Sequence, residues 1–362
     1  EGGGLYTVGS STVIDIDGGT IDGATAANGG GWSAVSTGSA ILRASGLTIA
    51  NCRATNSGGG LHLRVATVSL NGVRFVGCFA NSPQGGGGAV FVAISGIVTM
   101  VASIIEACVA EKHGSAVYSA AGAVAILSSS TIANCRSADV YQSRGALYVI
   151  GRLALTDGSV VVNSSGGFTG GLNVAAGGEA AVVDSSFIGC DAPGDARDSA
   201  TAPMVAEAGA VLVESFGSLA MVNVTIDNAT SPTFATAIAV ERNGTLRASI
   251  VRIILACNVT RISCLVGGTT CTTGVSPPAI GTEGEPLALA DLTVTIVEGC
   301  ADGDGAFSGL DGDRKLARLT NGPGVLPSMC GPSTCGDEAV CSYAKPLVGG
   351  TKPLATPTCA CV

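Results

Sequence analysis

A short phrase that ends in Cys, Asn or Ser recurs along the chain, and its spacing constrains the fold more than any other feature. The last residues of successive phrases lie 26, 30, 27, 29, 26, 38, 29 and 43 positions apart, so most intervals are close to 28. Repeats of about 20 to 50 residues are typical of solenoids, in which each repeat packs on its neighbours. The phrases are Leu47–Cys52, Val73–Cys78, Ser103–Cys108, Ser130–Cys135, Ser159–Ser164, Ser185–Cys190, Asn223–Asn228, Arg252–Cys257 and Thr295–Cys300.

Two further apolar phrases occur between these. One opens on small residues such as Gly87-Gly88 and continues as an alternating segment, Ala89–Ala93; the other follows a Gly, as in Gly96–Val101. Three short strands in each repeat predict one turn of a parallel β-helix, an all-β fold of about nine coils. The alternative, a β-sandwich, predicts turns every 8 to 12 residues or so and gives no reason for Cys at one phase of a long period.

The composition excludes several other classes of protein. The formal net charge is −9 and no basic stripe is present, which argues against nucleic-acid binding. A hydrophobic fraction of 46% argues against disorder. The longest charge-free stretch, residues 114–135, is interrupted by Ser and Gly too often for a membrane-spanning helix. Because the chain starts at Glu1 without a signal peptide and ends just after a Cys-Ala-Cys segment, we expect it to be part of a longer protein.

Seven cysteines share one phase of the repeat and predict a ladder along the core. Stacked Cα atoms near 4.8 Å lie inside the range of about 4.4–6.8 Å that a disulfide requires, but parallel Cβ vectors hold the sulfur-bearing atoms too far apart without a local tilt. Buried free thiols and disulfides between coils therefore both remain open. The ladder consists of Cys52, Cys78, Cys108, Cys135, Cys190 and Cys257, with Cys300 as a seventh member.

The other seven cysteines predict disulfides outside the ladder. Cys264 and Cys271 are seven residues apart and are expected to pair across a loop. Such a dense Cys pattern in a short Pro-rich tail indicates a small segment stapled by disulfides in place of a core. We therefore divide the chain into a β-helix over residues 1–325, irregular and loop-rich from about residue 265, and a Cys-rich segment over 326–362. The tail cysteines are Cys330, Cys335, Cys341, Cys359 and Cys361.

Asn-x-Ser/Thr sequons are more frequent than chance predicts. N-linked glycans and a Cys-rich tail both belong to a secreted, disulfide-permissive environment. We therefore expect an extracellular or cell-surface glycoprotein. The five sequon asparagines are Asn163, Asn223, Asn228, Asn243 and Asn258.

The paired motifs of the repeat resemble those of a known family. Gly-Gly-Ala-Val at residues 87–90 and the Phe-x-x-Cys phrases Phe75–Cys78 and Phe187–Cys190 are similar to the Gly-Gly-Ala-Ile and Phe-x-x-Asn motifs of polymorphic outer-membrane-protein repeats, with Cys in place of Asn. This resemblance covers roughly residues 10–300 and implies a right-handed β-helix of the pectin-lyase-like superfamily. Known members are surface adhesins, and similar repeats occur in large extracellular proteins of protists and algae. The tail resembles an EGF-like module that stops before its sixth cysteine.

Catalytic chemistry is sparse in this sequence. Lyases and hydrolases that share the implied fold use clustered carboxylates, and only Asp157 and Asp184 fall at nearly the same phase of adjacent repeats. Two turn-forming aspartates explain that pair more simply. His62 and His113 lack Cys or His neighbours at metal-ligand spacing, and Trp32 is the single Trp that a sugar-binding surface could use. We predict no catalytic residues.

Two acidic segments remain. Asp15, Asp17 and Asp22 continue the strand alternation and are interpreted as part of the first coil. The second segment offers carboxylates as a weak candidate for Ca²⁺, although it lacks the closing Glu of an EF-hand loop. Its residues are Asp302, Asp304, Asp311 and Asp313. Beyond this ion and N-linked glycans we expect no cofactor.

Three functional hypotheses follow. The preferred one is a non-catalytic structural or adhesive module of a large secreted glycoprotein, such as a subunit of an extracellular filament, appendage or wall, with other extracellular proteins or copies of itself as partners. The first alternative is an adhesin module that binds glycans or another cell through the insertions at 191–203 and 272–286. The second alternative is a polysaccharide lyase or hydrolase that acts in a groove of the β-helix.

Overall fold

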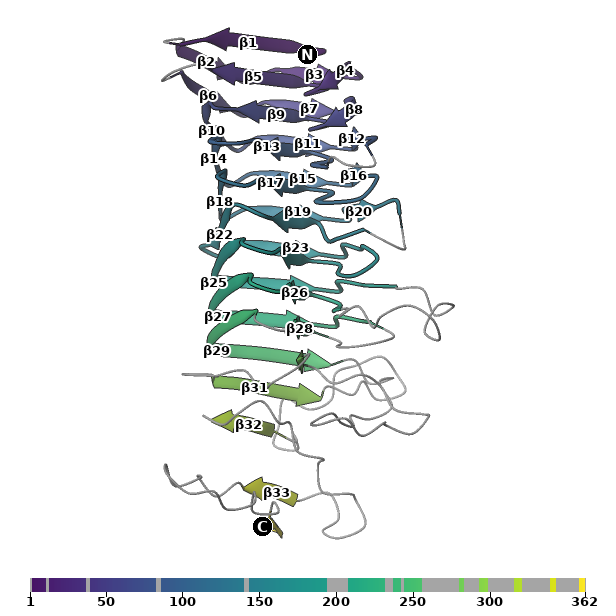
Figure 1. The fold of residues 1–362 in the computed structure, drawn as a ribbon, viewed down its shortest axis with the longest axis vertical. Helices are drawn as coiled ribbons and strands as arrows, with labels where there is room; N and C mark the ends of the chain where they lie inside the picture. The colour runs from purple at the N-terminus through teal and green to yellow at the C-terminus, as the bar shows by residue number, and fades with distance from the viewer. Residues whose placement is uncertain are drawn as a thin grey trace.

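The chain folds as an all-β parallel solenoid of about eight turns (Figure 1). The computed structural model describes residues 2–10, 13–36, 40–82, 86–139, 143–193, 208–231, 237–241 and 244–254 with their side chains, and 255, 280–282, 293–298, 316–320, 339–342 and 358–361 by their backbone. None of these residues is helical. The predicted fold class is confirmed, with a turn count close to the nine coils expected from the phrases.

Sheet A contains one strand from each turn, and every strand pairs in parallel with the strand of the next turn. From β1 to β26 these strands follow the Gly-containing phrase of the repeat. They are β1 (Leu5–Gly9), β5 (Trp32–Ser36), β9 (Leu61–Arg64), β13 (Val90–Val92), β17 (Val117–Ser119), β21 (Leu147–Val149), β24 (Leu172–Val174), β26 (Val211–Val213), β28 (Ile238–Val240) and β30 (Ile280–Thr282).

Sheet B contains the other two predicted strands of each repeat, which lie end to end in one wall. From β25 onward the two strands merge into one. The strands are β2 (Val13–Asp17), β3 (Thr20–Asp22), β6 (Ile41–Ser45), β7 (Thr48–Ala50), β10 (Thr67–Asn71), β11 (Arg74–Val76), β14 (Ile97–Val101), β15 (Ile104–Glu106), β18 (Val124–Ser128), β19 (Thr131–Ala133), β22 (Arg152–Thr156), β23 (Val160–Val162), β25 (Glu179–Ile188), β27 (Ser218–Asp227), β29 (Thr245–Leu255), β31 (Thr293–Glu298) and β32 (Leu316–Thr320).

Sheet C is a wall that the sequence did not predict. Its strands are short because the chain turns again almost immediately after the Cys-phase residue. They are β4 (Thr25–Asn28), β8 (Arg53–Ser57), β12 (Phe79–Ala80), β16 (Val109–Ala110) and β20 (Arg136–Ser137). The prediction of three strands per repeat is therefore wrong for these turns, because each of them has four strands.

A residue with positive φ bends sheet B in each turn from β2 to β29. The bend residue in the first three turns is Gly, and in later turns it is a larger residue, all with φ between 47° and 69°. This left-handed conformation lets the wall change direction without breaking the ladder. The bend ladder consists of Gly18, Gly46, Gly72, Ala102, Ser129, Asp157, Asp184, Asn223 and Ile250.

A buried serine follows the bend in four turns and explains why the repeat phrase often begins with Ser. The Ser130 hydroxyl oxygen accepts the Ser103 N–H at 3.2 Å, and the Ser159 hydroxyl oxygen accepts the Ser130 N–H at 3.1 Å. The Ser130 hydroxyl donates to the Ser128 carbonyl at 2.9 Å. Backbone groups that the bend removes from the sheet ladder are thereby satisfied inside the rod.

The core is a continuous column of inward side chains enclosed by the three walls. Leu61 and Leu63 of β9 point into it and are fully buried. Glycine is required where two walls approach each other, because a Cβ on Gly60 would lie 2.6 Å from the Phe75 ring. A Cβ on Gly59 would lie 2.4 Å from the carbonyl oxygen of Gly88 in the next turn. The Gly-Gly phrase is therefore a packing requirement of the solenoid.

The C-terminal predictions are only partly covered by the described residues. The predicted domain boundary near residue 325 lies outside them. Within the predicted Cys-rich segment, β33 (Ala339–Ser342) and β34 (Thr358–Cys361) pair antiparallel, with Cys341 opposite Cys359. The β31–β32 pair is also antiparallel, so the regular parallel stacking ends there.

Phe75→Ala is expected to lower the free energy of unfolding by about 3–5 kcal/mol, because it leaves a cavity in the column. Phe75 is fully buried, whereas Phe216 is 69% exposed. Phe216→Ala is the matched control and should change stability by less than about 0.5 kcal/mol. Urea unfolding followed by circular dichroism measures both, and equal losses would contradict the inward assignment of Phe75.

Candidate functional site

The Cys phase lies at the corner between sheets B and C, on the inside of the rod. Cys52, Cys78, Cys108, Cys135 and Cys190 are fully buried free thiols. Each thiol donates to a backbone carbonyl, for example Cys78 Sγ to the Ile49 oxygen at 3.4 Å. Ser164 occupies the same phase and donates to the Val162 oxygen at 3.2 Å. The turn after Cys190 has Ala229 at this phase, so the repeat phrase that was expected to end at Asn228 ends one residue later. Cys257 and Cys300 lie outside the described residues.

The environment of the ladder suppresses thiolate formation. The hydrogen bond with the neighbouring Cys78 thiol is the main cause that raises the pKa of Cys52, and the Cys108 thiol does the same for Cys78. Burial raises the pKa of Cys108, and it raises that of Cys190 to about 12. A thiol held protonated in the core is a poor nucleophile and a poor metal ligand.

The ladder thiols are expected not to react with iodoacetamide in the native protein and to react fully after unfolding, since the reagent requires an accessible thiolate. Peptide mass spectrometry after labelling measures each site. Ser129→Cys places a thiol on the exposed bend ladder and is the positive control, which should be labelled in the native state. Native labelling of Cys108 at the rate of that control would contradict the described burial.

Three of the five sequon asparagines lie among the described residues, and all three are exposed. Asn163 and Asn228 hold the left-handed position immediately before the Cys phase, with φ of 47° and 49°. Asn223 belongs to the bend ladder, and its Nδ2 donates to Asp184 Oδ1 at 2.7 Å. Asn243 and Asn258 are outside the described residues.

Asp157 and Asp184 are neighbours in the bend ladder, as their shared phase predicted. Both have positive φ, which supports the interpretation as turn residues. Asp157 accepts hydrogen bonds from the hydroxyls of Ser128 at 2.7 Å and Thr156 at 2.8 Å, and these bonds lower its pKa. Both carboxylates are thus engaged by side chains of their own or an adjacent turn.

The outer face of sheet A carries an aromatic stack that the sequence analysis did not identify. The rings of His62 and Phe91 lie 5.4 Å apart, those of Phe91 and Tyr118 4.8 Å, and those of Tyr118 and Tyr148 5.0 Å. The sequence contained a signal for this stack, because aromatic residues occupy equivalent positions of four successive repeats. These positions are aligned in β9, β13, β17 and β21. The stack is a second apolar layer outside the main core.

Trp32 does not belong to an exposed surface. Its side chain is fully buried in the main core, and Nε1 donates to the Thr7 hydroxyl at 3.3 Å. The single Trp of the chain is therefore not available to a sugar-binding surface, because its ring fills the core in the first turns.

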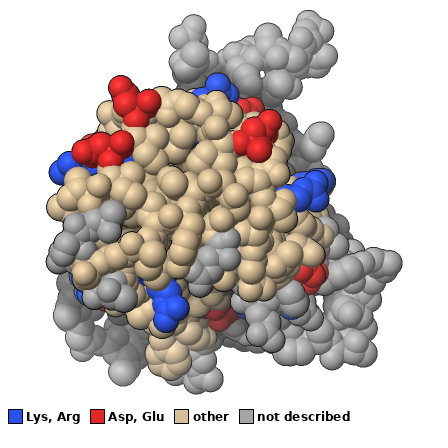
Figure 2. Space-filling view, turned by 90° about the horizontal axis from the view of Figure 1, so that it is seen from above, with Lys and Arg blue, Asp and Glu red and all other residues tan. Residues whose placement is uncertain are grey.

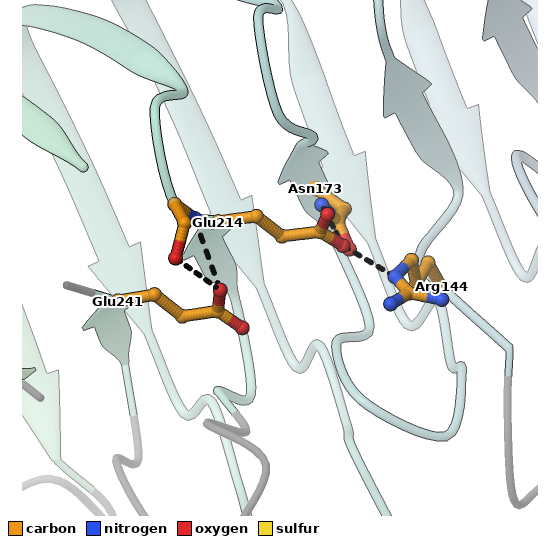
Figure 3. Close-up of polar contacts among 5 residues, drawn as sticks. Arg144, Asn173, Glu214 and Glu241 are labelled. Carbon is orange, nitrogen blue, oxygen red and sulfur yellow. Dashed lines mark hydrogen bonds and ion pairs between the residues drawn. The ribbon is translucent and has the colours of Figure 1, made fainter. Parts of the chain in front are cut away.

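Figure 3 shows a polar cluster with residues from four successive turns. The cluster is next to the aromatic stack, because Asn173 is in register with Tyr148. Glu214 follows β26 and accepts hydrogen bonds from Arg144 Nε and from Asn173 Nδ2, the latter at 3.2 Å. The Arg144 guanidinium also lies over the Phe168 ring, 5.2 Å from its centroid. Glu241 follows β28 and accepts from the N–H of Ser215 at 3.0 Å. No sequence motif marks this cluster, because Arg144 and Glu214 are 70 residues apart.

The cluster is suited to holding the chain before β21 against sheet A. The side chains of Arg144 and Glu214 are 26% and 14% exposed, so the ion pair is largely shielded from water. A partly buried pair of this kind is costly to break because it leaves an uncompensated charge. Arg144 also contacts Phe168, and Glu214 also accepts from Asn173. The ion pair therefore holds the backbone at Arg144 in place against sheet A.

His113 stacks on Tyr148 next to this cluster, with ring centroids 4.8 Å apart. Burial, and then the Arg144 and Lys112 charges, lower its pKa from 6.5 to about 4, against a smaller opposing effect of Asp139. His113 is therefore neutral at physiological pH.

Acidification should destabilise the protein through His113. Its pKa is lower in the folded than in the unfolded state, so stability falls as the pH drops from about 6.5 to about 4 and stays constant below that. His113→Phe keeps the ring stack, and the native protein should lose up to about 3 kcal/mol more than this variant between pH 7 and 4. Urea unfolding at a series of pH values measures the difference, and parallel stability curves would contradict it.

The remaining candidate residues have no described surroundings. Asp302, Asp304, Asp311, Asp313, Cys264, Cys271, Cys330 and Cys335 lie outside the described residues, and Cys341, Cys359 and Cys361 are described by backbone alone. In the part of the chain that is described, no three His, Cys, Asp or Glu residues are placed to hold a metal ion. The same part contains no helix able to cross a membrane.

Comparison with known proteins assigns no family. No family model and no curated protein matches the chain. Among solved structures, a crystal structure of a TibC-catalysed, hyper-glycosylated TibA fragment is similar at 16% sequence identity, with 69% of this chain and 94% of that chain covered and a TM-score of 0.13. A score this low supports no conclusion about fold or function. The resemblances to polymorphic outer-membrane-protein repeats and to EGF-like modules stay predictions.

Proposed function

We propose that the chain is a non-catalytic structural rod of a secreted, cell-surface glycoprotein. The observation that carries this proposal is that charged side chains on the outside of the rod pair with the next turn. These pairs add to the parallel backbone ladders that run from turn to turn, so the surface chemistry reinforces stacking. The pairs are Arg43–Asp15 at 3.5 Å, Arg74–Glu106 at 3.7 Å and Arg152–Glu179 at 3.0 Å.

The surface of the first turn fits a further β-coil. Strands β1 to β4 pair with a described strand on one side only. Figure 2 looks onto this end and shows charged residues around its rim, with an uncharged centre. Leu5, Ile14, Ile16 and Ile21 pack against the core there but remain partly exposed. Such edges above an apolar surface favour stacking on a further coil, from the same polypeptide or from another molecule.

The finer parts of the proposal rest on the sequence. The right-handed, pectin-lyase-like form of the β-helix rests on the resemblance of its motifs. Exposure of the three side chains supports N-linked glycans at Asn163, Asn223 and Asn228, and such glycans favour an extracellular site of action. Its partners would be other extracellular proteins or copies of the same chain. The adhesin alternative relied on the insertions at 191–203 and 272–286, most of which are outside the described residues.

Electron microscopy of the native protein, purified from its source without reduction, tests this function. Fibres or sheets with the rod as repeating unit are expected, and dispersed, monodisperse particles would overturn the structural role. Ile14→Lys adds a charge to the apolar surface of the first turn and should shorten the assemblies. Val13→Lys, at an exposed position on the same strand, is the matched control and should leave them unchanged.

A further inference from the structure

Two tyrosines of the aromatic stack lie next to each other in successive turns. Tyr118 of β17 and Tyr148 of β21 are in register, and their ring centroids are 5.0 Å apart with the ring planes tilted by 55°. The two residues are only 9% and 8% exposed. Gly86 leaves room for the Tyr118 ring, because a Cβ at Gly86 would lie 2.7 Å from Tyr118 Cδ2. The fold therefore holds two phenol rings side by side.

The hydroxyl groups of this pair are not needed for packing or for hydrogen bonding. Phe91 is in register with Tyr118, so the same row accepts a ring without a hydroxyl. A buried Tyr usually finds a hydrogen-bond partner for its hydroxyl. Neither phenolic oxygen makes a hydrogen bond with a described residue, and neither belongs to the buried polar atoms that lack a partner. Both oxygens therefore reach solvent, although most of each ring is buried.

Oxidation can join two phenols that are held in this way. A one-electron oxidant takes one electron from each phenol, water accepts the two protons, and two phenoxyl radicals remain. The radicals couple between the ring carbons next to the oxygen-bearing carbons, and the product then rearranges to two phenols joined by a carbon–carbon bond. Two phenols and two equivalents of oxidant thus give one dityrosine, two protons and two equivalents of reduced oxidant.

The surroundings of the pair favour coupling between these two rings. Because the rings are already side by side, coupling needs no diffusional encounter and only a small approach of one ring edge to the other. Burial raises the pKa of Tyr118 and of Tyr148, so each phenol is protonated at physiological pH and loses its proton together with the electron. The ladder thiols could reduce a phenoxyl radical, but they lie inside the rod, whereas this stack is outside the main core.

We propose that Tyr118 and Tyr148 are an oxidative crosslinking site, at which a small one-electron oxidant forms a dityrosine bond between two turns of the rod. The bond closes a loop of one turn, so it restricts the unfolded chain as a disulfide does. Unlike a disulfide, it resists reducing agents. This proposal goes beyond the structural role and holds whether or not the rod assembles.

Oxidation of the full chain with photogenerated tris(bipyridyl)ruthenium(III), followed by reduction, trypsin digestion and mass spectrometry, tests the site. Trypsin places Tyr118 in peptide 113–136 and Tyr148 in peptide 145–152, and it places Tyr141 in a third peptide between them. Peptides 113–136 and 145–152 should be recovered as one species that has lost two hydrogen atoms. The oxidised chain should remain monomeric on a denaturing gel.

The yield of this product should be at least about tenfold higher from the native protein than from the protein in concentrated urea, because only the fold positions the two rings. Tyr148→Phe keeps the ring and should abolish the product. Tyr6→Phe removes a phenol that is 44% exposed on β1, and this matched control should leave the yield unchanged. Circular dichroism checks that both variants are folded.

Three results would each overturn the proposal: no joined peptide from the native protein, equal yields with and without urea, or a main product that contains Tyr141 in place of Tyr118 or Tyr148. Filament formation is a separate measurement, so failure of the crosslink is distinguishable from failure of the structural role.

Discussion

Parallel stacking of successive turns in a fixed register is the constraint on which the rest of this structure depends. Each turn is hydrogen-bonded to the turns before and after it, so a residue type that suits one position must suit the same position throughout. Inward rows become ladders of Leu, Val and Cys, and bend rows become ladders of residues that tolerate positive φ. Outward rows become continuous stripes along the rod. A single substitution therefore affects the contacts with the equivalent residues of the neighbouring turns, and seldom one contact alone.

Close packing of the three sheets determines at which positions glycine is required and at which positions other residues are tolerated. Gly59 and Gly60 face backbone and ring atoms at distances that exclude any side chain. At the bend ladder the opposite holds, because Asp157 and Asn223 adopt the same conformation as Gly72. Core packing therefore requires glycine at Gly59 and Gly60, whereas other residues can replace glycine on the bend ladder.

Many polar side chains of this protein stabilise the packing of one turn on the next. The buried serines accept backbone N–H groups at the bend, and the buried thiols donate to carbonyls at the next corner. Arg144, Asn173 and Glu214 hold an outer segment against sheet A across three turns. These interactions replace water for groups that burial would otherwise leave unsatisfied.

The sequence by itself determined the solenoid, the phase of Cys52 to Cys190 and the turn character of Asp157, because a period near 28 residues and local turn chemistry are both properties of the chain read in order. It did not reveal sheet C, whose two-residue strands at Phe79 and Val109 are too short to show a periodicity. The burial of Trp32, the stack from His62 to Tyr148 and the pairing of Arg144 with Glu214 were decided only by the tertiary structure. Each depends on which residues of different turns come into register, and insertions of unequal length between repeats set that register.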